Sequence, residues 1–210
     1  LVLLLAVNVF PLLYSLWLSF TNADLIGGGS ASSVGTLNYT FLFFDPRYAA
    51  ALRTTAAFVA AAVGVELVLG YGLALCLRDG FRGKTALLTV LLVPMMMPPA
   101  VMGVYWKLIL NGSYGVLNQI LGGLGWAQPQ WTTDPDLKLL SLLLVDVWMW
   151  TPFMMLISLA SLNAIPPSIY EAAAIDRASA WRVFRRITLP MSAPLVGLAV
   201  LLRATDALKQ

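Results

Sequence analysis

Residues 139–162 read LLSLLLVDVWMWTPFMMLISLASL, and the chain continues as NAIPPSIYEAAAIDRASAWRVFRRITLP over residues 163–190. The first stretch is mostly apolar with Asp146 as its one charged residue, and it exceeds the roughly 20 residues that a helix needs to cross a bilayer. The second stretch mixes Arg, Asp and Glu with alanines, which favour helix. The sequence therefore predicts a membrane span that leads into an ordered polar segment.

Four other stretches share the apolar character of residues 139–162. Together they predict an all-α, polytopic membrane helical bundle that forms a single domain over residues 1–210. The chain starts without Met and stops inside its last apolar run, so about six spans are expected in a full chain and five are expected here. The expected spans are residues 1–20, 52–77, 85–110, 139–162 and 191–210.

Composition argues against several other classes of protein. Hydrophobic residues make up 60% of the chain and charged residues 11%, which is less than half the charged share of a soluble domain. The net charge is +3, but the basic residues are too sparse for a nucleic-acid surface. The chain has no His, and Cys76 is its single Cys. A metal centre, a disulfide framework and His-based catalysis are therefore not expected.

Basic residues predict the orientation of the chain in the membrane. Arg78, Arg82 and Lys84 lie between the second and third expected spans, and residues 177–186 form a second basic group between the fourth and fifth. Short loops rich in Lys and Arg stay on the cytoplasmic side. Both links, and with them the amino terminus, are expected to be cytoplasmic.

A proline cluster interrupts the third expected span at Pro94, Pro98 and Pro99. Proline in a membrane helix frees backbone groups, which neighbouring helices or water must then satisfy. A tolerated kink is the simpler interpretation, and a hinge that lines a pathway is the alternative.

Residues 163–190 are expected to form two short helices. Ser168 and Glu171 have the spacing of a capping box, which predicts the start of the first helix. The second helix is expected to begin near Ser179 and to end at Pro190.

The second short helix carries an apolar stripe formed by Trp181, Phe184 and Ile187. Beside a membrane, such a stripe either lies on lipid or fills a groove in a partner protein. Packing under the chain's own spans is a further possibility. The pattern by itself leaves these uses open.

The polar segment resembles the EAA motif of ABC importer permeases. Residues 146–155 and 202–209 are similar to the sugar-permease branch of that family, the relatives of the maltose, glycerol-phosphate and trehalose importers. The resemblance covers nearly the whole chain from Leu52 onward. The residues of the segment that carry it are Glu171, Ala172, Ala173, Asp176, Ala178, Phe184, Ile187, Leu189 and Pro190.

The resemblance implies a type I importer permease fold with a coupling segment that binds in a cleft of a cytoplasmic ATPase. The family usually has Gly after Asp176, where this chain has Arg177. Arg resists the left-handed conformation that a sharp turn needs, so either the turn is built differently or docking is altered. The residues expected to couple to the ATPase are Glu171, Ala172, Ala173, Asp176, Arg177, Ala178, Phe184 and Pro190.

The implied function is that of a permease subunit in the bacterial cytoplasmic membrane, which moves a sugar or sugar-like solute inward by alternating access. Its implied partners are a second permease subunit, two ABC ATPase subunits, an extracytoplasmic solute-binding protein and the lipid bilayer. The chain has no Gly-rich phosphate loop, so ATP and Mg²⁺ are expected on the ATPase subunits, with no catalytic residue and no cofactor in this chain. The alternatives are a permease for another solute class, an ATP-independent secondary transporter and an integral-membrane enzyme.

Aromatic and charged residues within the spans are the candidates for a solute pathway. Aromatic faces combined with polar groups suit a sugar, and charges inside a membrane usually face protein or water. Arg203 and Asp206 are three residues apart and are expected to pair. The alternatives are an aromatic belt at the membrane surface and simple charge neutralisation. The candidates are Tyr105, Trp106, Asp146, Trp148, Trp150, Arg203 and Asp206, with Glu66 as a further charge inside a span.

Overall fold

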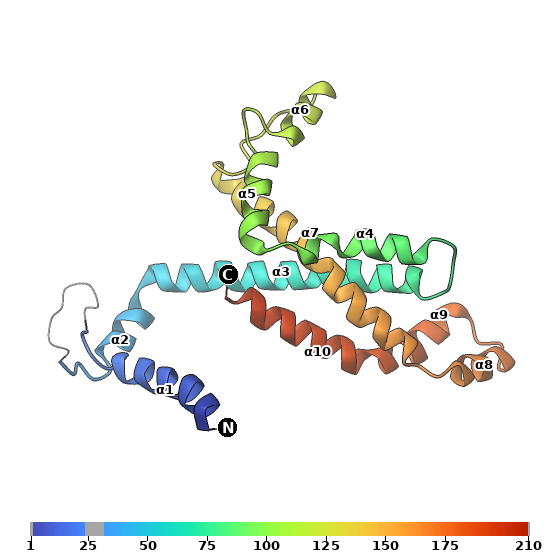
Figure 1. The fold of residues 1–210 in the computed structure, drawn as a ribbon, viewed down its shortest axis with the longest axis horizontal. Helices are drawn as coiled ribbons and strands as arrows, with labels where there is room; N and C mark the ends of the chain where they lie inside the picture. The colour runs from blue at the N-terminus through green and yellow to red at the C-terminus, as the bar shows by residue number, and fades with distance from the viewer. Residues whose placement is uncertain (1, 24–31, 210) are drawn as a thin grey trace. The chain divides into compact units, whose positions relative to one another are not determined.

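The computed structural model describes residues 2–23 and 32–209, with side chains from Leu5 onward, and its regular elements are helices (Figure 1). This confirms the all-α prediction. By its contacts the chain divides into two compact units, Leu1–Thr55 and Ala56–Gln210. The helices are α1 (Val2–Leu18), α2 (Leu37–Phe44), α3 (Pro46–Leu77), α4 (Lys84–Met96), α5 (Pro99–Ile109), α6 (Val116–Gly123), α7 (Pro135–Asn163), α8 (Pro167–Ile175), α9 (Ala180–Val183) and α10 (Leu189–Ala207), with a π-helix at Phe184–Thr188.

In the first unit, α2 packs on the end of α1 through polar contacts. The Asn38 side-chain amide donates to the Ser19 and Thr21 carbonyl oxygens at 2.9 Å each, and the Phe20 and Tyr39 rings lie 5.4 Å apart. Helix α1 has 17 residues, which at 1.5 Å per residue gives a length of about 26 Å. This is shorter than the roughly 30 Å of a bilayer core. The structure therefore does not confirm residues 1–20 as a span.

Three continuous helices, which lie wholly or mostly in the second unit, are long and apolar enough to cross a membrane. They are α3 with 32 residues, α7 with 29, and the uninterrupted helical stretch Ala180–Ala207 with 28. The pair α4 and α5 brings the number to four if the two count as one broken span. Within the described residues, the predicted number of five spans is therefore not confirmed, although the helical membrane bundle is.

The third expected span, residues 85–110, is broken between α4 and α5 with a bend of 96°. A proline disfavours helical geometry in the residue before it. Accordingly Met97, before Pro98, and Pro98, before Pro99, are both extended, with ψ angles of 140° and 134°. Pro99 then starts α5, a position where its missing N–H costs nothing. The interpretation as a tolerated kink is wrong, because two consecutive extended residues turn the chain through a corner.

The core of the second unit lies where α3 meets α7. A Cβ placed on Gly70 would lie only 2.6 Å from the Met154 Cβ and 2.8 Å from the Met155 backbone nitrogen. Glycine at position 70 thus lets the two helices approach more closely than any larger residue would allow. Helix α7 runs obliquely across this unit, with α4 and α10 packed against it (Figure 1). The buried residues at these contacts are Val63, Ala74, Leu77, Met154, Met155, Leu159, Leu162 and Ala199.

Candidate functional site

The segment between α7 and α10 begins with α8, which starts at Pro167. Pro166 is extended with ψ 134°, and the α8 start has no side-chain cap. Ser168 therefore lies inside the first turn, and the predicted capping box with Glu171 is wrong. The reason is that the paired prolines set the start of the helix two residues earlier than the Ser–Glu spacing predicts, with Pro166 and not Ser168 at the N-cap.

The turn after α8 is a Schellman motif in which Arg177 takes the place usual for glycine. The Ala178 N–H donates to the Ala173 carbonyl at 3.0 Å, and the Arg177 N–H donates to the Ala174 carbonyl at 3.0 Å. Arg177 has a φ of 50°, in the left-handed region. The sharp turn expected of the family is thus formed despite the missing glycine, at a cost of about 1 kcal/mol.

The second short helix begins where the sequence predicts. The Ser179 side chain accepts from the Arg182 N–H at 3.4 Å and caps α9. Pro190, however, does not end this helix. A π-helix over Phe184–Thr188 joins α9 to α10, and Pro190 lies in the first turn of α10. The wider π turn places the Leu189 N–H on the Phe184 carbonyl, so the helix continues through the proline.

A groove of about 410 Å³ lies between α8 and α9. Ala173 is buried beneath it, which lets the two helices approach, whereas Glu171 and Asp176 are exposed. Two arginines, Arg182 and Arg186, line the opposite wall. The groove combines a small apolar floor with charged walls. Its remaining lining residues are Ile169, Ala172, Ala178, Val183 and Ile187.

The apolar stripe of the second helix is only partly covered. The Trp181 and Phe184 rings stack at 5.6 Å, and the Phe184 ring meets the edge of Tyr71 on α3 at 6.4 Å. Phe184 and Ile187 are half-buried, while Trp181 is 67% exposed. The stripe therefore packs against the chain's own span at Phe184 and leaves the Trp181 indole free for lipid or a partner.

A second polar region lies inside the bundle, where charges from three helices meet. The Arg203 guanidinium on α10 donates to both carboxylate oxygens of Glu66 on α3, at 2.9 and 3.0 Å, and to Asp146 on α7. All three residues are buried. The Arg203 guanidinium carbon also lies 4.8 Å from the centre of the Trp150 ring. This charge cluster, Glu66, Asp146 and Arg203, ties α3, α7 and α10 together.

The predicted pairing of Arg203 with Asp206 is only peripheral, because their charged atoms are 3.8 Å apart and Asp206 is partly exposed. Asp206 lies instead in a hollow of about 490 Å³ beside the cluster. Asp146, Trp150 and Lys209 line the same hollow. Four of the seven candidate pathway residues, Asp146, Trp150, Arg203 and Asp206, are thus brought together at one place.

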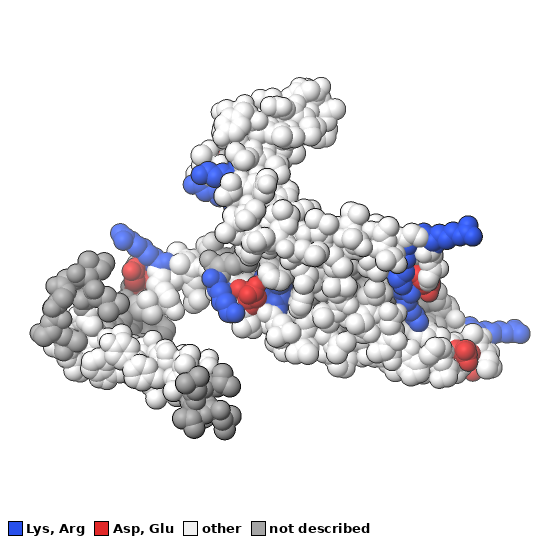
Figure 2. All heavy atoms as spheres, viewed as in Figure 1, with Lys and Arg blue, Asp and Glu red and all other residues white. Residues whose placement is uncertain are grey.

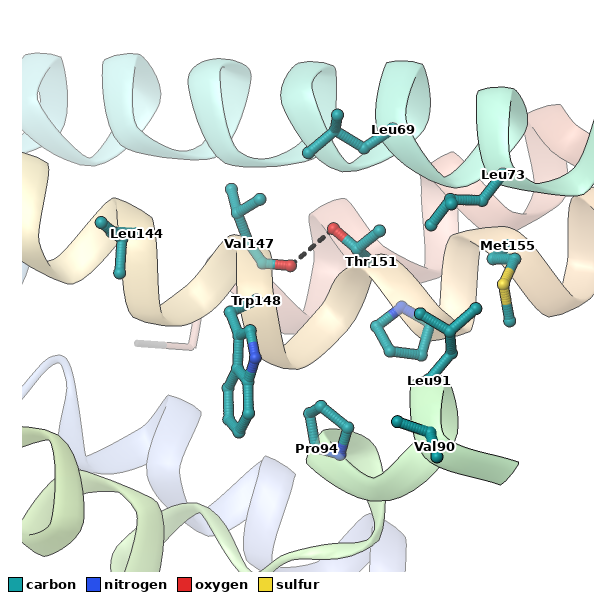
Figure 3. A pocket seen from close by; sticks show the side chains of 11 residues that line it. Leu69, Leu73, Val90, Leu91, Pro94, Leu144, Val147, Trp148, Thr151 and Met155 are labelled. Atoms are coloured by element: carbon teal, nitrogen blue, oxygen red, sulfur yellow. Dashed lines mark hydrogen bonds between the residues drawn. The ribbon is translucent and has the colours of Figure 1, made fainter. Parts of the chain in front are cut away.

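The other candidates lie elsewhere. Trp106 and Trp148 meet edge to face at 5.4 Å, and Tyr105 is 52% exposed. Trp148 lines a different hollow of about 520 Å³ between α3, α4 and α7, whose labelled side chains are almost all apolar (Figure 3). The Thr151 hydroxyl there donates to the Val147 carbonyl of its own helix at 2.6 Å, so it offers no free donor to a ligand. This hollow suits lipid or another helix better than a sugar.

On the face of the second unit shown in Figure 2, Lys and Arg side chains gather near the α3–α4 link and the α8–α9 segment. Between that end and the carboxyl end of α10 the surface is almost without charge. This separation matches the two polar regions described above, one at the end of the bundle and one inside it.

Sequence reasoning missed two contacts of the site. The sequence marks Glu66 as a charge within a span, but it does not identify the bidentate partner of Glu66, which is 137 positions away. Tyr170, next to Glu171, is not among the predicted site residues, although its ring lies against Arg78. A span carrying an acidic residue and another carrying Arg is the signal that points to the first pair. The second contact has no comparable signal.

Residues 66–210 match the protein family described as binding-protein-dependent transport system inner membrane component. The chain is 37% identical over 203 residues to a probable ABC transporter permease of Sinorhizobium fredii, covering 96% of this chain and 65% of that protein. It is 34% identical over 201 residues to the trehalose/maltose permease MalF of Thermococcus litoralis, covering 96% and 68%. It is 33% identical over 207 residues to the trehalose permease SugA of Mycobacterium tuberculosis, covering 99% and 66%. The chain thus spans about two thirds of the length of these relatives.

The fold is similar to that of a bacterial ABC transporter involved in the import of the acidic polysaccharide alginate. The TM-score is 0.83 at 20% identity, and the likeness covers 99% of this chain and 70% of that chain. A second structure of an alginate transporter, in complex with a pentasaccharide-bound periplasmic protein, gives a TM-score of 0.81 at 20% identity, covering 96% and 67%.

Proposed function

This chain belongs to the family of binding-protein-dependent transport system inner membrane components, and from that premise we propose that it is the permease subunit of an ATP-driven importer. It moves a sugar or sugar-like solute from an extracytoplasmic binding protein into the cytoplasm. The solute class is supported by relatives named as trehalose and maltose permeases.

The observation that carries this proposal is the geometry of the α8–α9 segment. Helix α8 ends in a tight turn, presents Glu171 and Asp176 to solvent, and borders a groove with a small-residue floor. A short helix of this kind at the end of a bundle suits insertion into a cleft of a partner protein. The proposed partners at this surface are two ABC ATPase subunits, which bind ATP and Mg²⁺.

The orientation follows from the same surface. With α8 and α9 in the cytoplasm, the basic α3–α4 link lies on that side too, in line with the distribution of Lys and Arg. Helix α3 then begins on the outer side, so a cytoplasmic amino terminus requires residues 1–20 to form a further span, and the chain sits in the bacterial cytoplasmic membrane. A second permease subunit is proposed to complete the membrane part, and the apolar hollow between α3, α4 and α7 offers a surface on which another helix could pack.

The hollow beside the charge cluster is the proposed solute contact. Trp150 offers an aromatic surface, and the partly exposed Asp206 offers a carboxylate acceptor for sugar hydroxyls. Alternating access then exposes this hollow first to the binding protein and next to the cytoplasm, as ATP binding and hydrolysis shift the equilibrium between two states.

The test is uptake by the full-length protein reconstituted in proteoliposomes with its ATPase subunits, the second permease and the binding protein. Radiolabelled trehalose and maltose serve as probes. Glu171→Gln is expected to lower ATP-dependent uptake about 30-fold, because loss of one partner of an interfacial charge pair costs about 2 kcal/mol or more.

Asp79→Asn is the matched control, since it removes an exposed carboxylate from the adjacent α3–α4 link. Uptake by this variant should equal that of the wild type. ATPase subunits that never copurify with the permease, together with uptake that continues without ATP in an ion gradient, would overturn the proposal in favour of a secondary transporter.

A further inference from the structure

Helix α8 is attached to the rest of the bundle through Tyr170, the residue immediately before Glu171. Tyr170 is half-buried, whereas Glu171 is exposed. The two side chains therefore point to different sides of α8, one toward the bundle and the other toward solvent. A force applied to the exposed side of this helix reaches the bundle through the inward side.

On one side, Tyr170 contacts the end of α3. The Arg78 guanidinium carbon lies 4.1 Å from the centre of the Tyr170 ring, well within the range of a cation–π interaction. Arg78 directly follows Leu77, the last residue of α3. The backbone at Arg78 is itself held, because the Lys84 ammonium donates to its carbonyl at 3.4 Å. Movement of the Tyr170 ring thus acts on the end of a span.

On the other side, Tyr170 contacts the entry to α10. Its hydroxyl lies 3.2 Å from the hydroxyl of Thr188, the last residue of the π-helix, and Thr188 is buried. One tyrosine side chain therefore joins α8 to two spans at once, to α3 through its ring and to α10 through its hydroxyl.

A second set of contacts joins α3 directly to α10. The Ser192 hydroxyl lies 2.8 Å from the Tyr71 hydroxyl on α3 and 3.2 Å from the Leu189 carbonyl of its own helix. Tyr71 also meets the edge of Phe184 at 6.4 Å. The cytoplasmic parts of α3 and α10 are thus joined to each other as well as to α8.

We propose that Tyr170 is a positioning residue that transmits displacement of α8 to α3 and α10 through Arg78 and Thr188. The inference rests on the proposed function, in which ATPase subunits move α8. Its specific content is that this contact sets how much solute is moved per ATP hydrolysed, without itself binding ATPase or solute. Coupling of two sites through such a joint is expected to change by a factor of about 5 or more when the joint is lost.

The experiment measures uptake per ATP hydrolysed by the complete transporter in proteoliposomes, with trehalose and maltose as probes. Tyr170→Leu removes both contacts, Tyr170→Phe removes only the hydroxyl, and Arg78→Gln removes only the charge over the ring. Tyr170→Leu is expected to lower uptake per ATP about fivefold or more while the ATPase subunits still copurify. Tyr170→Phe and Arg78→Gln should each lower uptake per ATP by a smaller factor. Arg78→Lys keeps a cation over the ring, so it should retain most of the uptake per ATP that Arg78→Gln loses.

Two controls match these changes away from the joint. Arg82→Gln removes an exposed charge from the same link, and Tyr114→Phe removes an exposed tyrosine hydroxyl. Both should leave uptake per ATP unchanged. The double variant Arg78→Gln with Tyr170→Leu should be no worse than Tyr170→Leu alone, because the two residues act in one contact.

ATP-dependent uptake by the wild-type complex distinguishes failure of the proposed function from failure of the positioning role of Tyr170. If the wild-type complex shows no ATP-dependent uptake, the proposed function fails. If it does, and the Tyr170 and Arg78 variants keep the wild-type ratio, the positioning role is refuted. Loss of ATPase copurification in Tyr170→Phe would refute it too, because Tyr170 would then be a docking residue. Should Tyr170→Leu not accumulate in the membrane, Tyr170→Phe, Arg78→Gln and Arg78→Lys decide the question.

Discussion

The charge cluster inside the bundle and the α8–α9 segment at its end use charge in opposite ways. In the cluster, Arg203 is bound by Glu66 and Asp146, and all three are buried. In α8–α9, Glu171 and Asp176 are exposed. The cluster therefore contributes to how the helices are held together, whereas the segment keeps its charges available to another protein.

The two regions also differ in what removal of one charge does. A charge left unpaired in a buried site keeps its desolvation penalty, whereas an exposed charge is solvated with or without a partner. Substitutions that disturb the buried bundle should therefore change stability more than substitutions in the exposed segment do. The following substitutions test this difference.

The largest effect is expected from Arg203→Met, which leaves Glu66 and Asp146 buried without their common partner. Stability should fall by about 3–5 kcal/mol, the cost of breaking a buried ion pair from one side. Thermal unfolding in detergent measures it, with Lys209→Met, a 73% exposed position, as the control. The triple variant Arg203→Met, Glu66→Met, Asp146→Leu should recover most of the loss. A triple variant as unstable as the single one would contradict this account.

A smaller effect is expected one helical turn from Glu66, at Gly70. Gly70→Ala places a Cβ within 2.9 Å of Met154 and Met155 atoms, and such overpacking costs about 1–3 kcal/mol. Gly72→Ala is the matched control on the same helix, because a Cβ placed there would have no neighbouring atom within 4 Å. It should stabilise α3 by up to about 1 kcal/mol through helix propensity. The same unfolding assay compares them, and equal midpoints would show that α3 and α7 are not closely packed at Gly70.

In the α8–α9 segment, Arg177→Gly should increase stability by about 1 kcal/mol, because glycine adopts the φ of 50° without steric cost. Hydrogen exchange of the α8 amides should slow accordingly. Arg185→Gly, within the π-helix, is the control and should have the opposite sign. Faster exchange in Arg177→Gly would mean that the Arg177 side chain makes a contact that outweighs the strain.

The smallest effect is expected from Ser179→Ala, which removes the cap of α9. The hydrogen bond is long at 3.4 Å, so a loss of about 0.5 kcal/mol is expected, at the lower end for helix caps. Exchange of the Arg182 amide should report it. Ser168→Ala is the control, because Ser168 does not cap α8, and it should change nothing. A loss at Ser168 instead of Ser179 would reinstate the capping box.

Much of this structure can be predicted from the sequence where local rules apply. Apolar runs predict α3 and α7, Ser179 predicts the start of α9, and the EAA-like segment predicts the importer-permease family, which the match over residues 66–210 confirms. These features depend on neighbours in sequence. Hydropathy, capping and motif spacing all act over a few residues.

The features that sequence reasoning misses depend on residues far apart or on competing local signals. Spacing predicts that Arg203 pairs with Asp206 three positions away, but the bidentate contact with Glu66 on α3 is the closer one. Pro190 is expected to end a helix, and a π turn instead carries the helix past it. Distance in sequence hides the first contact, and the rarity of π turns hides the second.

Because of the π-helix at Phe184–Thr188, a one-residue deletion there should disturb the fold less than a one-residue deletion in α10. A π turn closes its hydrogen bond over one residue more than an α turn does, so deletion of one residue here would let the turn relax to ordinary geometry. The side chains beyond it would then keep their directions. Deletion of one residue within α10, between Leu189 and Arg203, cannot be accommodated in this way, because α10 already has α-helical geometry. Arg203 would rotate by about 100° about the helix axis and turn away from Glu66 and Asp146.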